Sequence, residues 1–96
     1  MNLDPYLLAI RSDSERMASA ATDGDLSAPV EACPGWDLRE LVSHTGAVHR
    51  WATTAIDGGV APATVEYSWP APDAAGDELS AWLLDGAETL TTTLAA

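Results

Sequence analysis

Apolar residues recur at three- and four-residue spacing in three stretches of the chain, a pattern typical of amphipathic helices. The spacing predicts helices over about residues 4–22, 37–57 and 77–95. The stripe positions are Leu3, Tyr6, Leu7, Ile10, Met17 and Ala21; Leu38, Leu41, Val42, Thr45, Val48, Ala52 and Ile56; and Leu79, Trp82, Leu83, Leu90 and Leu94. The pattern therefore predicts an all-α fold.

Local signals mark the ends of the second helix. Pro34-Gly35 predicts a turn, because proline presets one backbone angle and glycine permits conformations that other residues avoid. Asp37 suits the N-cap, and Glu40 can reach back to it as in a capping box. Asp57-Gly58-Gly59 predicts the end of the helix, where a glycine can adopt the left-handed cap conformation.

The segment from residue 58 to residue 75 is rich in glycine, proline and alanine. Val65, Tyr67 and Trp69 alternate with polar residues, which allows a short extended piece, but the prolines forbid a long strand. We expect a loop that crosses the surface with its aromatic side chains packed on the helices. A pocket lined by Tyr67 and Trp69 is the alternative.

The apolar stripe of the third predicted helix continues to Leu94, and no C-cap glycine precedes Ala96. We therefore expect residues 1–96 to form a single, incomplete helical-bundle domain: three helices of an up-down four-helix bundle. Its fourth helix is missing from the chain or supplied by a partner. The expected consequence is an exposed apolar groove, filled in a homodimer or by pairing with a missing C-terminal half.

Composition narrows the classes of partner. A chain of 96 residues fits one small domain with a modest core. Its formal charge of −11 disfavours nucleic acid and anionic membrane surfaces, which attract basic proteins. No leader segment opens the chain, and no apolar run approaches the ~18 residues of a membrane span. A single cysteine excludes an internal disulfide, so we expect a cytoplasmic protein.

Most of the reactive side chains lie between residues 33 and 51, including the single cysteine and both histidines. On a helix, His44 and His49 are about 140° apart, so they do not suit one shared ion. A metal site would use one of them with ligands from elsewhere; the alternative is a hydrogen-bonded histidine on the flank of a helix. Cys33 is interpreted as a turn residue rather than a nucleophile, because two carboxylates and no histidine are nearby in sequence.

The series Cys33-Pro34-Gly35-Trp36, then residues 37–44, then Val48-His49-Arg50-Trp51 resembles the amino-terminal part of the actinobacterial mycothiol-dependent maleylpyruvate isomerase-like family. That family belongs to the DinB-like superfamily of metal-binding four-helix bundles. Residues 81–87 resemble its third helix. The resemblance implies a divalent metal, often zinc, held by a histidine on the second helix and by an E-x-x-x-H pair on a later helix.

Carried over by position, the resemblance makes His44 the metal ligand. No histidine follows His49, so the chain lacks the E-x-x-x-H pair and is either a fragment or a protein that has lost the metal. The implied function is thiol-dependent isomerisation or transfer of a small molecule with a mycothiol-type thiol. No catalytic residue is assigned. The alternative is a non-catalytic helical module that oligomerises through its exposed apolar groove.

Overall fold

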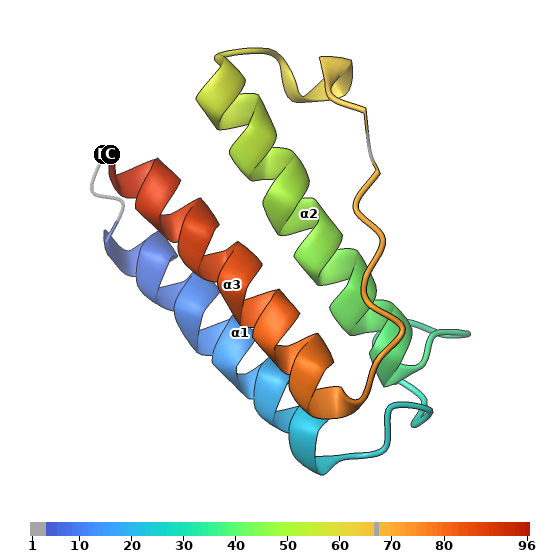
Figure 1. Ribbon diagram of the computed structural model, residues 1–96. Helices are drawn as coiled ribbons and strands as arrows, with labels where there is room; N and C mark the ends of the chain where they lie inside the picture. Colours follow the sequence, from blue (N-terminus) through green and yellow to red (C-terminus); the bar gives the residue numbers. More distant parts are fainter. Residues whose placement is uncertain (1–3, 67) are drawn as a thin grey trace.

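The computed structural model describes residues 4–66 and 68–96. They form α1 (Asp4–Asp23), α2 (Leu38–Gly58), the short 3-10 helix η1 (Pro62–Thr64) and α3 (Gly76–Ala95) (Figure 1). The predicted all-α class with three long helices is confirmed. Leu3 and Tyr67, which the sequence placed in a stripe and in the connecting segment, lie outside the described residues. None of the described helices combines the length and the apolar character that crossing a membrane requires.

The predicted signals at both ends of α2 are present. The backbone N–H of Glu40 donates to Asp37 Oδ1 at 2.8 Å, and the Asp37 N–H donates to Glu40 Oε1 at 3.3 Å, which completes the capping box. At the other end, Gly59 has a φ of 60° and its N–H donates to the Ile56 carbonyl oxygen. Glycine suits this position because it adopts the left-handed conformation without a Cβ clash.

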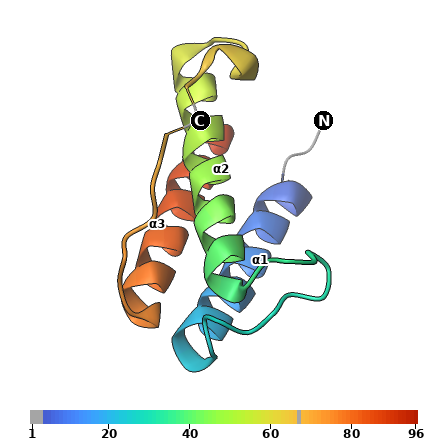
Figure 2. The ribbon, with the colours of Figure 1, turned by 90° about the vertical axis from the view of Figure 1, so that its right-hand side faces the viewer.

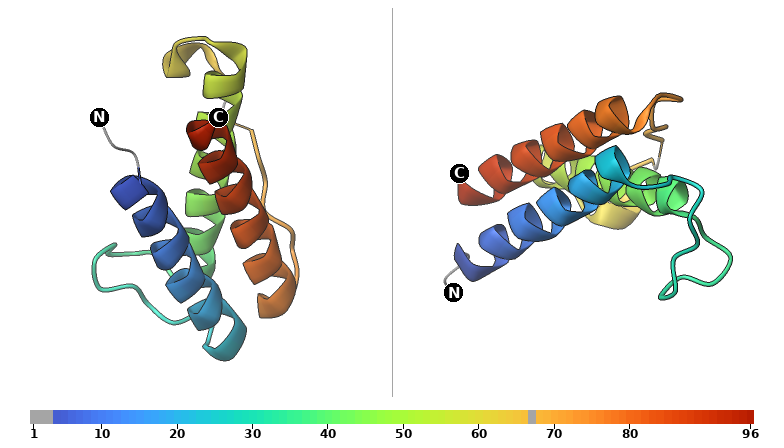
Figure 3. Two further views of the ribbon diagram at one scale, coloured as in Figure 1. Left: turned by 90° about the vertical axis from the view of Figure 1, so that its left-hand side faces the viewer. Right: turned by 90° about the horizontal axis from the view of Figure 1, so that it is seen from below.

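Close packing of small residues joins α1 to α3 in antiparallel orientation. The Ser80 hydroxyl lies 2.7 Å from the carbonyl oxygen of Ala18 and 2.8 Å from the Thr22 hydroxyl. A Cβ at Gly76 would collide with the carbonyl of Ala21. The end of α1 therefore lies against the start of α3, and Figure 3 shows the two helices side by side along their length.

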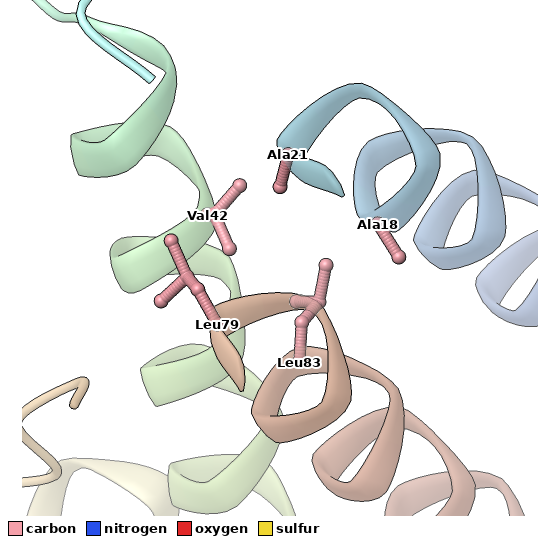
Figure 4. Close-up of a cluster of buried hydrophobic side chains, with 5 residues drawn as sticks. All are labelled: Ala18, Ala21, Val42, Leu79 and Leu83. Carbon is pink, nitrogen blue, oxygen red and sulfur yellow. The ribbon is translucent and has the colours of Figure 1, made fainter. Parts of the chain in front are cut away.

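The central apolar cluster takes side chains from all three helices, which point toward one another in Figure 4. Its members are Ala18 and Ala21 from α1, Val42 from α2, and Leu79 and Leu83 from α3. The valine and the two leucines are fully buried. Because two of the five members are alanines, which bury little area, this cluster stabilises the fold less than five large side chains would.

α2 and α3 run in the same direction (Figures 1 and 3). Their contacts advance together along both helices: Val42 packs in the cluster with Leu79, Gly46 faces Trp82, and Arg50 faces Gly86. The directions of successive helices therefore do not alternate between α2 and α3, unlike the up-down arrangement expected from the sequence. The reason is the connection between the two helices, which in its described parts, residues 59–66 and 68–75, returns along the outside of α2 to the end where α2 began (Figure 2).

An arginine clamp fastens α2 to α3, and we use this name for Gly46, Arg50, Trp82 and Gly86 together. The Arg50 guanidinium carbon lies 4.1 Å from the centroid of the Trp82 ring. Its Nη1 donates to the Gly46 carbonyl oxygen at 3.1 Å, and its Nη2 donates to the Trp82 carbonyl oxygen at 2.8 Å. One side chain thus bonds the backbone of both helices, and a cation over an indole adds about 0.5–2 kcal/mol.

Both glycines of the arginine clamp are required because side chains of the facing helix approach them closely. A Cβ at Gly46 would collide with the Trp82 ring, and a Cβ at Gly86 would collide with the Arg50 guanidinium. From sequence alone, Gly86 only weakens the third helix. In the fold, the Arg50 guanidinium occupies the space that a side chain at residue 86 would fill.

We predict that Gly46→Ala lowers the free energy of unfolding by about 1–3 kcal/mol, because the added methyl group displaces the Trp82 ring. Urea titration followed by circular dichroism measures it. Gly58→Ala is the matched control in the same helix, since its Cβ would meet only Val60 at ordinary distances of 3.5 and 3.9 Å. Equal stability of the two variants would contradict the predicted collision.

Candidate functional site

Residues 26–39 form a compact turn that delivers the chain to α2. Backbone N–H groups of Val30 and Leu38 donate to the carbonyl oxygens of Trp36 and Ala28, both at 3.0 Å. Within this pairing, the Trp36 N–H donates to the Cys33 carbonyl oxygen at 3.0 Å, and Gly35 has a φ of 86°. The predicted Pro-Gly turn is confirmed, and it holds Trp36 just before the helix begins.

Cys33 contributes to this turn through its backbone. Its N–H donates to the Val30 carbonyl oxygen at 3.1 Å, and its carbonyl accepts from Trp36. The thiol is free and half-buried. These backbone hydrogen bonds agree with the interpretation of Cys33 as a turn residue.

His44 lies on the outer side of α2 and is exposed. It is two residues from Val42 and two from Gly46, both buried, so its direction is about 160° away from theirs. The Trp36 and His44 rings meet edge to face, with centroids 5.2 Å apart and an interplanar angle of 72°. The turn before α2 thus limits the orientations of the imidazole.

His49 has different surroundings. The side chain is half-buried, and its Nδ1 is buried without a hydrogen-bond partner within residues 4–66 and 68–96. Burial lowers the pKa of His49 below its ordinary value, and the neighbouring Arg50 cation lowers it further. The neutral form is therefore favoured in the folded protein.

Neither histidine belongs to a cluster of three potential metal ligands among the described residues. Across the described part of the chain, no group of three or more histidine, cysteine, aspartate or glutamate side chains could hold a metal ion. His44 is presented to solvent while His49 faces inward.

A pocket of about 290 Å³ lies beside the arginine clamp, between α2, α3 and the connecting segment. We call it the Arg50 pocket; its lining is Arg50, Thr53, Thr54, Trp69, Asp85, Gly86 and Thr89. Of the alternative pocket lined by Tyr67 and Trp69, the part that concerns Trp69 is present, while Tyr67 lies outside the described residues. Sequence reasoning missed Arg50 and Asp85 as pocket residues. The one signal for Arg50 was its position four residues after Gly46, beside an apolar stripe.

Residues 7–96 match the family model described as the mycothiol maleylpyruvate isomerase N-terminal domain. The chain belongs to this family. The match includes α2 and α3 in full, and it confirms the resemblance seen between Cys33 and Trp51. No curated protein and no solved structure matches the chain significantly.

For this family domain we predict a loss of stability in acid that depends on His49. Burial depresses the folded-state pKa, so the unfolded chain binds the proton first as pH falls below about 6.5. The free energy of unfolding of the wild type should therefore fall relative to His49→Gln between pH 7.5 and 5, by at most about 1.4 kcal/mol per pH unit.

Urea titrations of both proteins at each pH measure this difference. Using the difference removes the contribution of the fifteen acidic side chains, which the two proteins share. Parallel pH profiles for wild type and His49→Gln would contradict the prediction.

Proposed function

We propose that this chain is the helical N-terminal part of a protein that performs thiol-dependent isomerisation or transfer, with mycothiol or a similar thiol as co-substrate. We further propose that His44 supplies one ligand to a divalent metal, with zinc the first candidate. Family membership supports this function. The structural observation that carries it is the exposed His44 imidazole, oriented by Trp36 on the outer side of α2.

The residues described here do not by themselves fit a metal. His44 is a suitable donor, but within the described ranges it belongs to no group of three or more potential ligands, so further ligands are needed. Under this proposal they come from a second copy of the chain or from a C-terminal half. A divalent ion with three protein ligands keeps an open position for a thiol or water, which is the property that the proposed activity needs.

The chain's own contribution is to present the imidazole. The capping box fixes where α2 begins, and the arginine clamp fixes how α2 lies against α3. Trp36 then restricts the imidazole of His44. We also propose a cytoplasmic location, and the charge of −11 favours small molecules or another protein segment over nucleic acid or anionic membrane.

A second candidate function is an interaction module without chemistry that pairs with a second copy of itself. The observation that favours it is the exposure of large apolar side chains: 58% for Tyr6 and 65% for Leu8 on α1, and 43% for Ile56 on α2. α1 and α2 also touch each other little, since each packs mainly on α3. Exposed apolar surface of this kind often marks an interface.

We predict that His44→Gln lowers zinc binding at least tenfold, because one exposed imidazole is the donor that this chain contributes. Equilibrium dialysis of the purified protein, in its native assembly, against micromolar zinc followed by elemental analysis measures it. His49→Gln is the matched control, since its Nδ1 is buried within the fold, and it should bind zinc like the wild type. Thiol-dependent isomerase activity should follow the bound zinc.

Two results would contradict the metal proposal. Wild type and His44→Gln could retain equal amounts of zinc, or neither could retain any. In the second case, a stable dimer by light scattering would favour the interaction module.

A further inference from the structure

The Arg50 pocket lies on a different side of α2 from His44, and the proposed metal chemistry does not use it. At about 290 Å³ it is close to the lower end of small-molecule sites, which span about 300–1,000 Å³. It is walled by α2, α3 and the half-buried Trp69 of the connecting segment. Its size suits a ligand of a few heavy atoms.

Among the described residues, Arg50 is the one positively charged side chain in the lining of the pocket. Arg50 has five N–H donors, and within the described residues only two of them make hydrogen bonds, to Gly46 and Trp82. The guanidinium therefore keeps donors for a carboxylate. Its position is fixed by the arginine clamp, so little side-chain freedom would be lost on binding.

Apart from the indole N–H of Trp69, the remaining side-chain polar groups of the pocket are acceptors. The hydroxyls of Thr53, Thr54 and Thr89 donate to the carbonyl oxygens of the residues four positions earlier, at 2.8, 2.9 and 3.0 Å. Their protons are thus used, and their oxygens can only accept. Asp85 adds a carboxylate that is 81% exposed and lies 3.9 Å from Arg50, too far for a hydrogen bond.

We infer that the Arg50 pocket binds a small zwitterion, an α-amino acid, with its carboxylate on Arg50 and its ammonium on Asp85 and the threonine oxygens. A simple anion is disfavoured, because Asp85 repels it and the hydroxyls have no proton left to donate. A simple cation is disfavoured by Arg50. A ligand with an ammonium and a carboxylate on the same carbon matches the pair 3.9 Å apart, and the ring of Trp69 offers its side chain an apolar wall.

Three probes of related shape test the charge requirement. L-leucine carries both charges, 4-methylpentanoate lacks the ammonium, and 3-methylbutylamine lacks the carboxylate. Each is titrated into ¹⁵N-labelled protein while the amide signals of Thr54, Gly86 and Thr89 are followed. We expect saturable shifts with leucine and at least tenfold weaker binding of either analogue.

Two variants with the same change in net charge test the location. Asp85→Asn should weaken leucine binding at least tenfold without weakening 4-methylpentanoate. Glu78→Gln, an exposed acid in the first turn of α3 outside the pocket, should leave leucine binding unchanged. Both positions are exposed, so both variants are expected to fold.

The inference is overturned if leucine gives no saturable shift, if either analogue binds as tightly as leucine, or if Glu78→Gln weakens leucine binding as much as Asp85→Asn. The titrations contain no metal and no thiol. Their failure would therefore leave the proposed role of His44 untouched, and failure of that role would leave the pocket untouched.

Discussion

The contact between Arg50 and α3 is the interaction on which the rest of the structure depends. One guanidinium lies over the Trp82 ring and donates to a carbonyl oxygen on each of two helices. A half-buried cation needs such partners, because unpaired it would lose more solvation than packing returns. The partners can come this close only because residues 46 and 86 are glycines.

The same contact sets what α2 presents to its surroundings. With Gly46 and Arg50 facing α3, His44 faces outward, where Trp36 meets it edge to face. The Arg50 pocket opens beside the clamp, under Trp69. The alanine-rich central cluster fixes this rotation of α2 less firmly, since Val42 is its one buried member from α2 and only the partly buried Leu38 at the start of the helix adds to it. A polar contact therefore orients both candidate sites.

Helix positions and caps were predictable from sequence because they depend on nearby residues. The capping box of Asp37 and Glu40, the Gly59 cap and the Gly35 turn were all visible as local patterns. The direction of α3 was not predictable, since apolar periodicity shows which face of a helix is buried and not which way the helix runs. The return of the connection, seen at residues 59–66 and 68–75, decides this direction.

The site could be predicted in part. The family resemblance proposes His44 as a metal ligand, and this role stays a prediction. The outward placement of His44 follows from helical geometry once Val42 is known to be buried. The clamp could not be found, because a mid-helix arginine is usually solvated and its partner is thirty-two residues away in sequence. An apolar pattern also does not reveal that Thr53 and Ser80 are buried, because both are polar. Their hydroxyls are accommodated by bonds to backbone carbonyl oxygens.

A double-mutant cycle between Arg50→Met and Trp82→Leu tests the central claim most directly, with unfolding free energies measured by urea titration. The clamp predicts a coupling energy of about 1 kcal/mol or more. The parallel cycle of Arg50→Met with Asp85→Asn should give about 0.5 kcal/mol or less, because Asp85 is exposed and 3.9 Å away. A coupling between Arg50 and Trp82 near zero would contradict the account.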